Sequence, residues 1–290
     1  MIRRLLTLGV LAGAGLCASV VVAGLVLSAP APMAIGPPPD SLPGAETVTI
    51  PSTSGATVWG WWLPGQARGA LVLMHGVRGN RLQMLARAAK LHALGYGVLL
   101  FDLQAHGEST GRRITFGKLE SLDAAAAVGF VRGRLPQGRV GVIGVSLGGA
   151  AALLGPAPLP VDALVLESVY PDIGAALSNR LRVGLGPTLG PAFTPVLASL
   201  FQLLLPPVLG VSPAELRPID RIGSVVAPVL VVSGTEDDRT PLQEAQGLFD
   251  RAPQPKAFWA VQGAGHVDLE RFGPVAYWAT VLPFLEAHLR

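Results

Sequence analysis

Short apolar runs and helical patterns alternate along residues 46–290 and predict a mixed α/β domain. Six runs are almost uniformly apolar and end near glycine or polar turns, which is typical of buried strands. They occupy residues 69–74, 98–102, 139–145, 161–168, 228–234 and 256–261. Residues 82–94 and 119–134 carry apolar side chains at helical spacing. Strands that alternate with helices predict a mostly parallel central sheet flanked by helices, with functional sites at the carboxyl ends of the strands.

Two earlier segments have the period of antiparallel strands. Residues 47–50 and 57–62 alternate in polarity on either side of the turn Ser54-Gly55. We expect them to form a hairpin at one edge, with its tryptophans packed on the sheet.

The first 28 residues have the pattern of a membrane anchor. Arg3 and Arg4 precede an uncharged run over residues 5–27, which is long enough to cross a bilayer as one helix. The two arginines predict a cytoplasmic N-terminus and an extracytoplasmic domain. The alternative is a signal peptide whose cleavage releases the domain. The length of the run and the prolines at 30 and 32 favour an uncleaved, single-pass anchor in the cytoplasmic membrane.

Domain boundaries follow from this pattern. Residues 1–28 form the anchor, the Pro-rich residues 29–45 a stiff extended linker, and residues 46–290 the folded domain. Residues 170–226 are too long for a plain crossover between two strands, and they carry no charge between Arg182 and Glu215. We expect several short apolar helices here, forming a helical cap over about residues 171–220. The cap would line an acyl pocket or touch the membrane surface; a cap that only packs on the core is the open alternative.

Composition excludes some classes of partner. The 290 residues carry a net charge of only +3 and no dense Lys/Arg cluster, so no nucleic-acid partner is expected. Cys17 is the single cysteine, so the chain has no internal disulfide. Disulfide pairing therefore gives no indication of the redox compartment of the protein. Leu16 before it is not a small residue, which argues against a lipid-modified cysteine.

Ser146 is the candidate nucleophile. It is central to Gly144-Val145-Ser146-Leu147-Gly148, between an apolar strand and a stretch of small residues that begins a helix. A serine in Gly-x-Ser-x-Gly at such a junction occupies a tight turn that exposes its hydroxyl above the sheet.

A serine nucleophile needs a base, and the base needs an orienting acid. His266 follows the run 256–261 on a glycine-rich loop and is the candidate base, although it could be an ordinary loop residue. Asp237 is the chosen acid in the turn after residue 234, with Glu236 and Asp238 as solvated neighbours. Asp102 is a weaker alternative because it precedes Ser146 in the chain. The other histidines are weaker bases: His92 lies in a helical pattern, His288 near the C-terminus, and His106 in a position to hold a loop.

Two backbone N–H groups are candidates for the oxyanion hole. One belongs to Leu147, directly after the nucleophile, and the other to Val77 in the turn after His75-Gly76. Arg78 or Arg81 would meet an anionic group on the substrate, or lie in solvent. In the cap, Asn179 and Arg180 are further candidates to face the pocket. This chemistry requires no metal and no cofactor.

These motifs together resemble the α/β-hydrolase fold superfamily. The matching pieces are His75-Gly76, Phe101-Asp102 with residues 107–111, the Ser146 motif, residues 234–241 and Gly265-His266. The resemblance covers residues 46–290, with local features of the BEM46-like and acyl-peptidase-like bacterial serine hydrolases. It implies a catalytic triad of Ser146, His266 and Asp237. Thr240 stands where such proteins often have valine.

The sequence therefore predicts a membrane-anchored serine hydrolase that cleaves carboxylic esters, including lipid-like acyl esters, through an acyl-enzyme. A serine peptidase or acyltransferase with the same triad is the first alternative. A non-catalytic binding protein on the same fold is the second.

Overall fold

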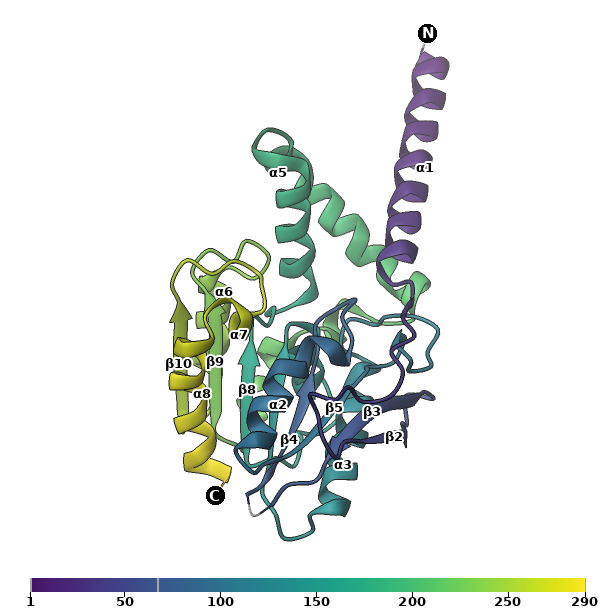
Figure 1. Ribbon diagram of the computed structural model, residues 1–290. Coiled ribbons are helices and arrows are strands. Elements are labelled where there is room, and N and C mark those ends of the chain that lie inside the picture. Colours follow the sequence, from purple (N-terminus) through teal and green to yellow (C-terminus); the bar gives the residue numbers. More distant parts are fainter. Residues whose placement is uncertain (1, 67, 290) are drawn as a thin grey trace.

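An eight-stranded mixed sheet forms the centre of the molecule (Figure 1). The computed structural model describes residues 2–66 and 68–289; within the first helix it describes side chains only for residues 3, 7, 11 and 13–27. The strand order is β10-β9-β8-β7-β4-β5-β3-β2, and only β2 and β3 run antiparallel to their neighbours. The strands are β2 (Glu46–Pro51), β3 (Thr57–Leu63), β4 (Ala70–Met74), β5 (Gly97–Phe101), β7 (Val140–Val145), β8 (Ala163–Glu167), β9 (Val229–Gly234) and β10 (Lys256–Val261). The predicted, mostly parallel sheet is confirmed.

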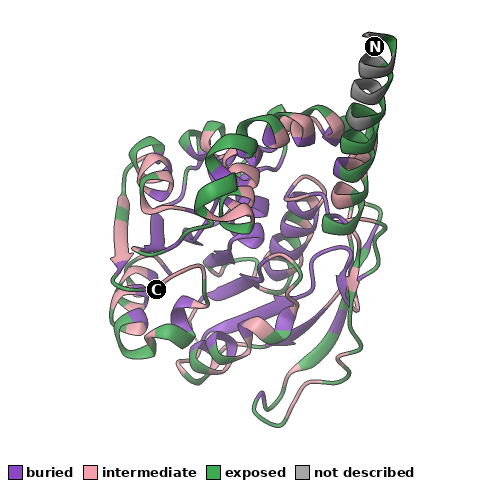
Figure 2. Ribbon diagram, turned by 90° about the horizontal axis from the view of Figure 1, so that it is seen from above, coloured by how far each residue is buried: buried purple, intermediate pink, exposed green. Residues whose placement is uncertain are grey.

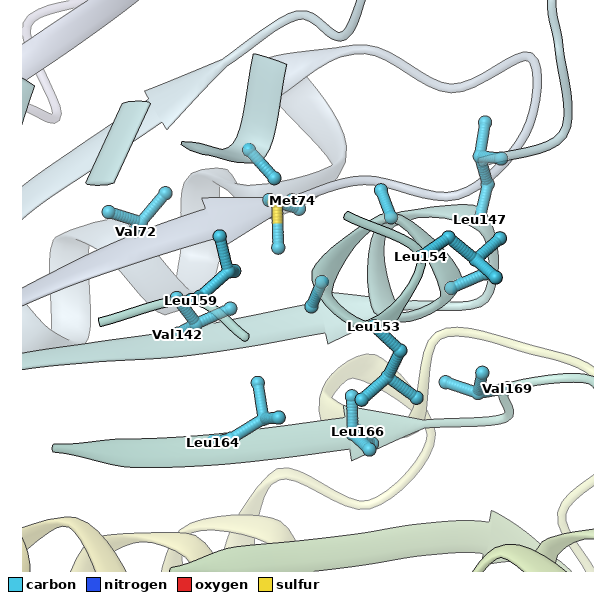
Figure 3. Packing of buried hydrophobic residues seen from close by; sticks show 14 of the residues in the cluster. Val72, Met74, Val142, Leu147, Leu153, Leu154, Leu159, Leu164, Leu166 and Val169 are labelled. Atoms are coloured by element: carbon cyan, nitrogen blue, oxygen red, sulfur yellow. The ribbon is translucent and has the colours of Figure 1, made fainter. Parts of the chain in front are cut away.

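Helices cover both faces of the sheet, which explains why its central strands are apolar throughout. In β4, Leu71 and Leu73 pack toward one layer of helices, and Val72 and Met74 toward the other. The first layer contains α2 (Leu85–Ala93), which extends a short 3-10 turn, and α8 (Pro274–Leu289). The second contains α3 (Glu120–Arg134), α4 (Leu147–Leu153) and α6 (Leu242–Arg251). Figure 3 shows Leu153 of α4 beside Leu166 of β8, and Val142 of β7 beside Leu159.

The segment between β8 and β9 is a helical hairpin. Helix α5 (Ile173–Leu209) bends at Gly186, whose φ of 72° and ψ of 179° interrupt the helical backbone. Pro187 begins the second limb. A proline is tolerated there because the first N–H of a helix has no acceptor within the helix. The expectation of several short helices is wrong. The second limb remains one continuous helix although it contains Pro191, Pro195, Pro206 and Pro207. Three short 3-10 turns over residues 213–224 lead back to β9.

Helix α1 (Ile2–Leu27) projects from the same side of the domain as α5 (Figure 1). Its C-terminal part packs on the domain, where Val20 is buried. Ser28, directly after the helix, is also buried, and its carbonyl accepts a hydrogen bond from the Ile114 N–H (2.8 Å). Arg4 and most side chains of residues 5–12 lie outside the described residues, so the first half of the predicted anchor has no side-chain description.

The Pro-rich segment after α1 is extended but held on the domain. Residues 31–32 form β1 (Ala31–Pro32), which pairs with β6 (His106–Gly107) in parallel. The carboxylate of Glu108 accepts hydrogen bonds from the N–H groups of Ile35 (3.0 Å) and Gly36 (2.9 Å). The segment therefore fixes the end of α1 close to the domain instead of spacing it away.

A buried guanidinium joins this segment to the sheet. Arg81 is fully buried, pairs with the carboxylates of Asp102 and Glu108, and lies 4.6 Å from the ring centroid of Trp61. The expectation that Arg81 meets an anionic substrate is wrong, because both of its carboxylate partners belong to the protein. Burial acts to raise the pKa of Glu108, but hydrogen bonds from Gly36, Arg81 and Ile35 outweigh it and lower that pKa from 4.5 to about 2.

We predict that Arg81→Leu lowers the free energy of unfolding by about 3–5 kcal/mol, because Asp102 stays buried without its counter-charge. Denaturant titration of the full chain in detergent measures this loss. Arg112→Leu is the matched control: Arg112 is exposed and has no ion-pair partner among the described residues, so a change within about 0.5 kcal/mol is expected. Equal midpoints for both variants would contradict the role given to Arg81.

Candidate active site

Ser146 occupies a strained turn between β7 and α4. Its φ of 49° and ψ of −107° lie outside the regions that non-glycine residues commonly adopt. The turn is held because the Ser146 N–H donates to the carbonyl of Glu167 in β8 (2.8 Å). A Cβ on Gly148 would lie 2.5 Å from the carbonyl oxygen of Met74, so only glycine allows α4 to pack this close to β4. The predicted strand-turn-helix around Ser146 is present.

Asp237 and His266 come together from the ends of two adjacent strands. Their loops are joined by a hydrogen bond from the Glu236 N–H to the carbonyl of Ala264 (2.9 Å). This approach requires Gly234, because a Cβ there would lie 2.0 Å from the same Ala264 oxygen. Nδ1 of His266 lies 2.9 Å and 3.1 Å from the two carboxylate oxygens of Asp237. The structure thus brings the candidate base and the candidate acid into direct contact.

The other acids of this turn are placed differently. Glu236 and Asp238 are exposed, and Asp102 pairs with Arg81. The Ser146 hydroxyl makes no hydrogen bond to His266 within the described part of the chain. Catalytic hydrogen bonds are often long before a substrate binds. We therefore expect the hydrogen bond between His266 and Ser146 to form in the substrate complex.

Two N–H groups beside Ser146 are free to bind an oxyanion. The Val77 N–H has no hydrogen-bond partner among the described residues, whereas the N–H of Gly76 next to it donates to Gln83 Oε1 (2.9 Å). The N–H of Leu147 belongs to the first turn of α4, where no intrahelical acceptor exists. Val77, Leu147 and Ser146 all line one cavity.

This cavity has a volume of about 210 Å³ and lies under α5. Its walls are mostly apolar and come from α1, the loop after β4, the segment before α3, and the first limb of α5. The lining residues are Leu27, Val77, Arg78, Phe116, Ser146, Leu147, Tyr170, Ile173, Ala176, Leu177 and Arg180. The helical hairpin therefore covers the candidate nucleophile, as expected of a cap.

The two arginine candidates line the cavity, and Asn179 does not. Arg78 donates to the carbonyl of Val26 at the end of α1 (2.5 Å), and Arg180 to the carbonyl of Ala176 in its own helix (3.1 Å). Asn179 is buried and donates to Glu244 Oε1 (2.7 Å), so it attaches α5 to α6. The expectation that Asn179 faces the pocket is therefore wrong.

Comparison with known proteins agrees with this architecture. A family profile described as "Serine aminopeptidase, S33" matches residues 65–206. The uncharacterised protein Rv2307c of Mycobacterium tuberculosis is 32% identical over 81% of this chain and 78% of its own length. The chain belongs to the α/β-hydrolase superfamily.

Other relatives of this α/β-hydrolase extend the picture. The α/β-hydrolase domain-containing protein WAV2 of Arabidopsis thaliana is 28% identical over 84% of this chain and 79% of its own length. An esterase of Pyrococcus furiosus has a solved structure that covers 91% of this chain and 99% of its own, with a TM-score of 0.74 and 23% identity. The esterase RhEst1 from Rhodococcus covers 83% of this chain and 99% of its own, with a TM-score of 0.61 and 18% identity. At these identities the solved structures show the fold alone.

Sequence reasoning missed two residues that position the site of the hydrolase. The first is Thr240, noted only as a departure from valine. Its hydroxyl donates to Asp237 Oδ2 (2.7 Å) and its N–H to Oδ1 (2.8 Å). Burial acts to raise the pKa of Asp237, but the hydrogen bonds from His266 and Thr240 outweigh it and hold that pKa below its usual range. Asp237 is thereby kept as a carboxylate, which can orient the imidazole of His266.

The second is His75, which the sequence placed only in a turn. Its Nε2 accepts a hydrogen bond from the Leu103 N–H (3.0 Å), so the ring proton is on Nδ1 and is donated to the carbonyl of Gly76 (2.7 Å). Burial, together with His106 nearby, lowers the pKa of His75 to about 3 and keeps the ring neutral. The ring thus fixes the Gly76–Val77 peptide group, which carries the Val77 N–H. His106 donates from Nδ1 to the carbonyl of Gln104 (2.9 Å) and holds its loop, as expected.

We predict that Thr240→Val slows fluorophosphonate labelling of Ser146 by about tenfold at neutral pH, because Asp237 loses a hydrogen bond to its charged form. Thr240→Ser keeps the hydroxyl and should restore most of the rate. A rate that requires ionised Asp237 is lost as the pH falls through the pKa of Asp237. The valine variant raises that pKa, so its loss should begin at higher pH. Overlapping pH–rate profiles for all three proteins would contradict this role.

Proposed function

We propose that this hydrolase is a membrane-anchored serine esterase that cleaves carboxylic esters with an apolar acyl group. The observation that carries the proposal is the contact between Asp237 and His266 on the same edge of the sheet as the Ser146 turn. Two N–H groups at the Ser146 cavity, from Val77 and Leu147, are placed to bind the oxyanion of acyl transfer.

The reaction follows from the positions of these groups. Ser146 Oγ attacks the ester carbonyl while Nε2 of His266 takes the hydroxyl proton, and Asp237 stabilises the imidazolium. The N–H groups of Val77 and Leu147 bind the negative oxygen of the tetrahedral intermediate. His266 then gives its proton to the leaving alcohol, which leaves an acyl-enzyme. Water activated by His266 hydrolyses the acyl-enzyme and regenerates Ser146.

The cavity favours an ester over a peptide with a free N-terminus. An aminopeptidase, the activity named by the matching family profile, must bind the ammonium group of its substrate. Among the described residues, the cavity wall contains two arginines and no carboxylate, so a cation would be repelled there. An apolar wall suits an acyl chain, and the esterases among the structural relatives support the same substrate class. Transfer of the acyl group to an alcohol other than water is the remaining variant with the same triad.

Membrane attachment is supported by two apolar helices on one side of the domain. Exposed apolar residues lie along α1 and α5, among them Leu16, Val22, Leu189, Phe193 and Leu203 (Figure 2). Within the described residues, α5 is the helix long and apolar enough to cross a membrane, and residues 13–27 of α1 form a shorter apolar helix. Helix α5 begins and ends at neighbouring strands of one sheet, so it would enter a bilayer as a hairpin without crossing it.

We propose that α1 is the uncleaved anchor in the cytoplasmic membrane and that the domain lies on its extracytoplasmic side. Retention of α1 is supported by buried Val20 and by Leu27, which lines the cavity with Ser146. Cleavage after residue 28 would remove this wall.

We predict that Ser146→Ala lowers the hydrolysis of p-nitrophenyl butyrate by about four orders of magnitude or more, because the nucleophile is lost. Ser199→Ala, on the exposed surface of α5, is the matched control and should keep the wild-type rate. A fluorophosphonate should form its adduct on Ser146, as located by mass spectrometry, and His266→Ala should abolish it. A folded wild-type protein that neither reacts nor is labelled would favour the non-catalytic alternative.

We predict that the protein remains in the membrane fraction after an alkaline carbonate wash. Intact mass spectrometry of the purified protein should show that residues 5–28 are still attached. A soluble product whose mass corresponds to a chain that starts near residue 29 would establish the secreted alternative instead.

A further inference from the structure

The wall of the catalytic cavity is completed by the N-terminal helix. Leu27, at the end of α1, lines the cavity together with Ser146, Phe116 and Leu177. Two contacts hold this end in place: Arg78 donates to the carbonyl of Val26, and the Ile114 N–H donates to that of Ser28. Arg78 directly follows Val77, so the end of α1 is attached to the loop that carries the candidate oxyanion N–H.

A second hollow adjoins this cavity and lies between α1 and α5. Leu27, Phe116, Ile173 and Leu177 line both hollows. The second is a narrow crevice of about 20 Å³, and every side chain on its wall is apolar. Its remaining lining residues are Val20, Gly24, Phe201, Leu204, Leu205, Val208 and Leu209.

Gly24 leaves the gap between the two helices. A Cβ built on Gly24 would lie 3.8 Å from Val208 Cγ1, which is ordinary contact, so a larger side chain would fill the crevice. Among the described residues, the side chains that meet across it are apolar. An acyl chain that entered here would replace their contacts with contacts of the same kind, at little cost in free energy.

We propose that the acyl chain of the substrate runs from Ser146 past Leu27 and into the crevice between α1 and α5. The N-terminal helix is then a wall of the substrate site as well as an anchor, and a long-chain ester reaches Ser146 laterally from the lipid that surrounds both helices. This inference rests on the proposed esterase function and adds the path of the chain. Each methylene that becomes buried between the two helices, by replacing their apolar contacts, should raise kcat/KM by about fourfold.

The test is the substitution Gly24→Leu in the full chain, purified into lipid nanodiscs. Hydrolysis of p-nitrophenyl esters with acyl chains of four and twelve carbons is compared. We expect the rate for the four-carbon ester to stay within twofold of wild type, while the ratio of the twelve-carbon to the four-carbon rate falls at least tenfold.

One variant serves as the matched control. Gly15→Leu makes the same change on α1 at a position where a Cβ meets no atom within 4 Å, and it should keep the wild-type ratio. Thermal unfolding and labelling of Ser146 by a short-chain fluorophosphonate show that each variant is folded and keeps its nucleophile.

The outcomes separate the chain path from the esterase function. An unchanged ratio in Gly24→Leu, or an equal loss for both esters, overturns the proposed path while leaving the esterase intact. If wild type cleaves neither ester, the esterase proposal fails. The path is then decided by displacement of a fluorescent twelve-carbon fatty acid from the detergent-solubilised protein. Weaker binding in Gly24→Leu but not in Gly15→Leu supports the path, and equal binding overturns it.

Discussion

The left-handed turn at Ser146 is the constraint on which the rest of the site depends. A serine adopts this backbone only where the surroundings hold it, and here strands on both sides of β7 do so. The hydrogen bond to Glu167 fixes the turn from β8, and the close contact of Gly148 with Met74 fixes it from β4. The turn places the Ser146 side chain and the Leu147 N–H at one cavity, so the position of the nucleophile and half of the oxyanion hole follow from the same backbone geometry.

Two buried guanidinium groups each join distant segments of the chain, and Arg87 is the one that reaches this turn. Arg87 pairs with Glu167 (2.8 Å) and with Asp268 (2.8 Å), and its Nε donates to Tyr277 (3.1 Å). Burial alone would lower the pKa of Arg87, but the charges of Glu167 and Asp268 and the hydrogen bond to Tyr277 raise it well above its usual value. Since Glu167 also accepts the Ser146 N–H and Asp268 follows His266 closely, Arg87 links the nucleophile turn to the histidine loop. Arg81 has the corresponding role between β5 and the segment after α1.

The helices above the sheet give the site its remaining walls. The polar groups proposed to take part in the reaction come from the loops of the α/β core. The apolar lining of the cavity comes mainly from α5, Phe116 and the end of α1. Rigid loops suit the chemical step, because the reacting atoms must stay in position. Helices that meet through apolar contacts alone suit the binding of a chain, because such contacts are exchanged at small cost.

Much of this arrangement could be predicted from the sequence, because it depends on short-range patterns. The strands around Ser146, the turn that contains Asp237 and the loop of His266 each occupy a few adjacent residues, and parallel strands bring their carboxyl ends to one edge. Only the tertiary structure decided the partners of Arg81 and Arg87, the attachment of residues 29–45, the continuity of the second limb of α5 past its prolines, and the place of α1 beside the cavity. Each depends on contacts between residues far apart in the chain, where a buried charge or an apolar face takes whichever partner the fold brings near, and no local spacing records that choice.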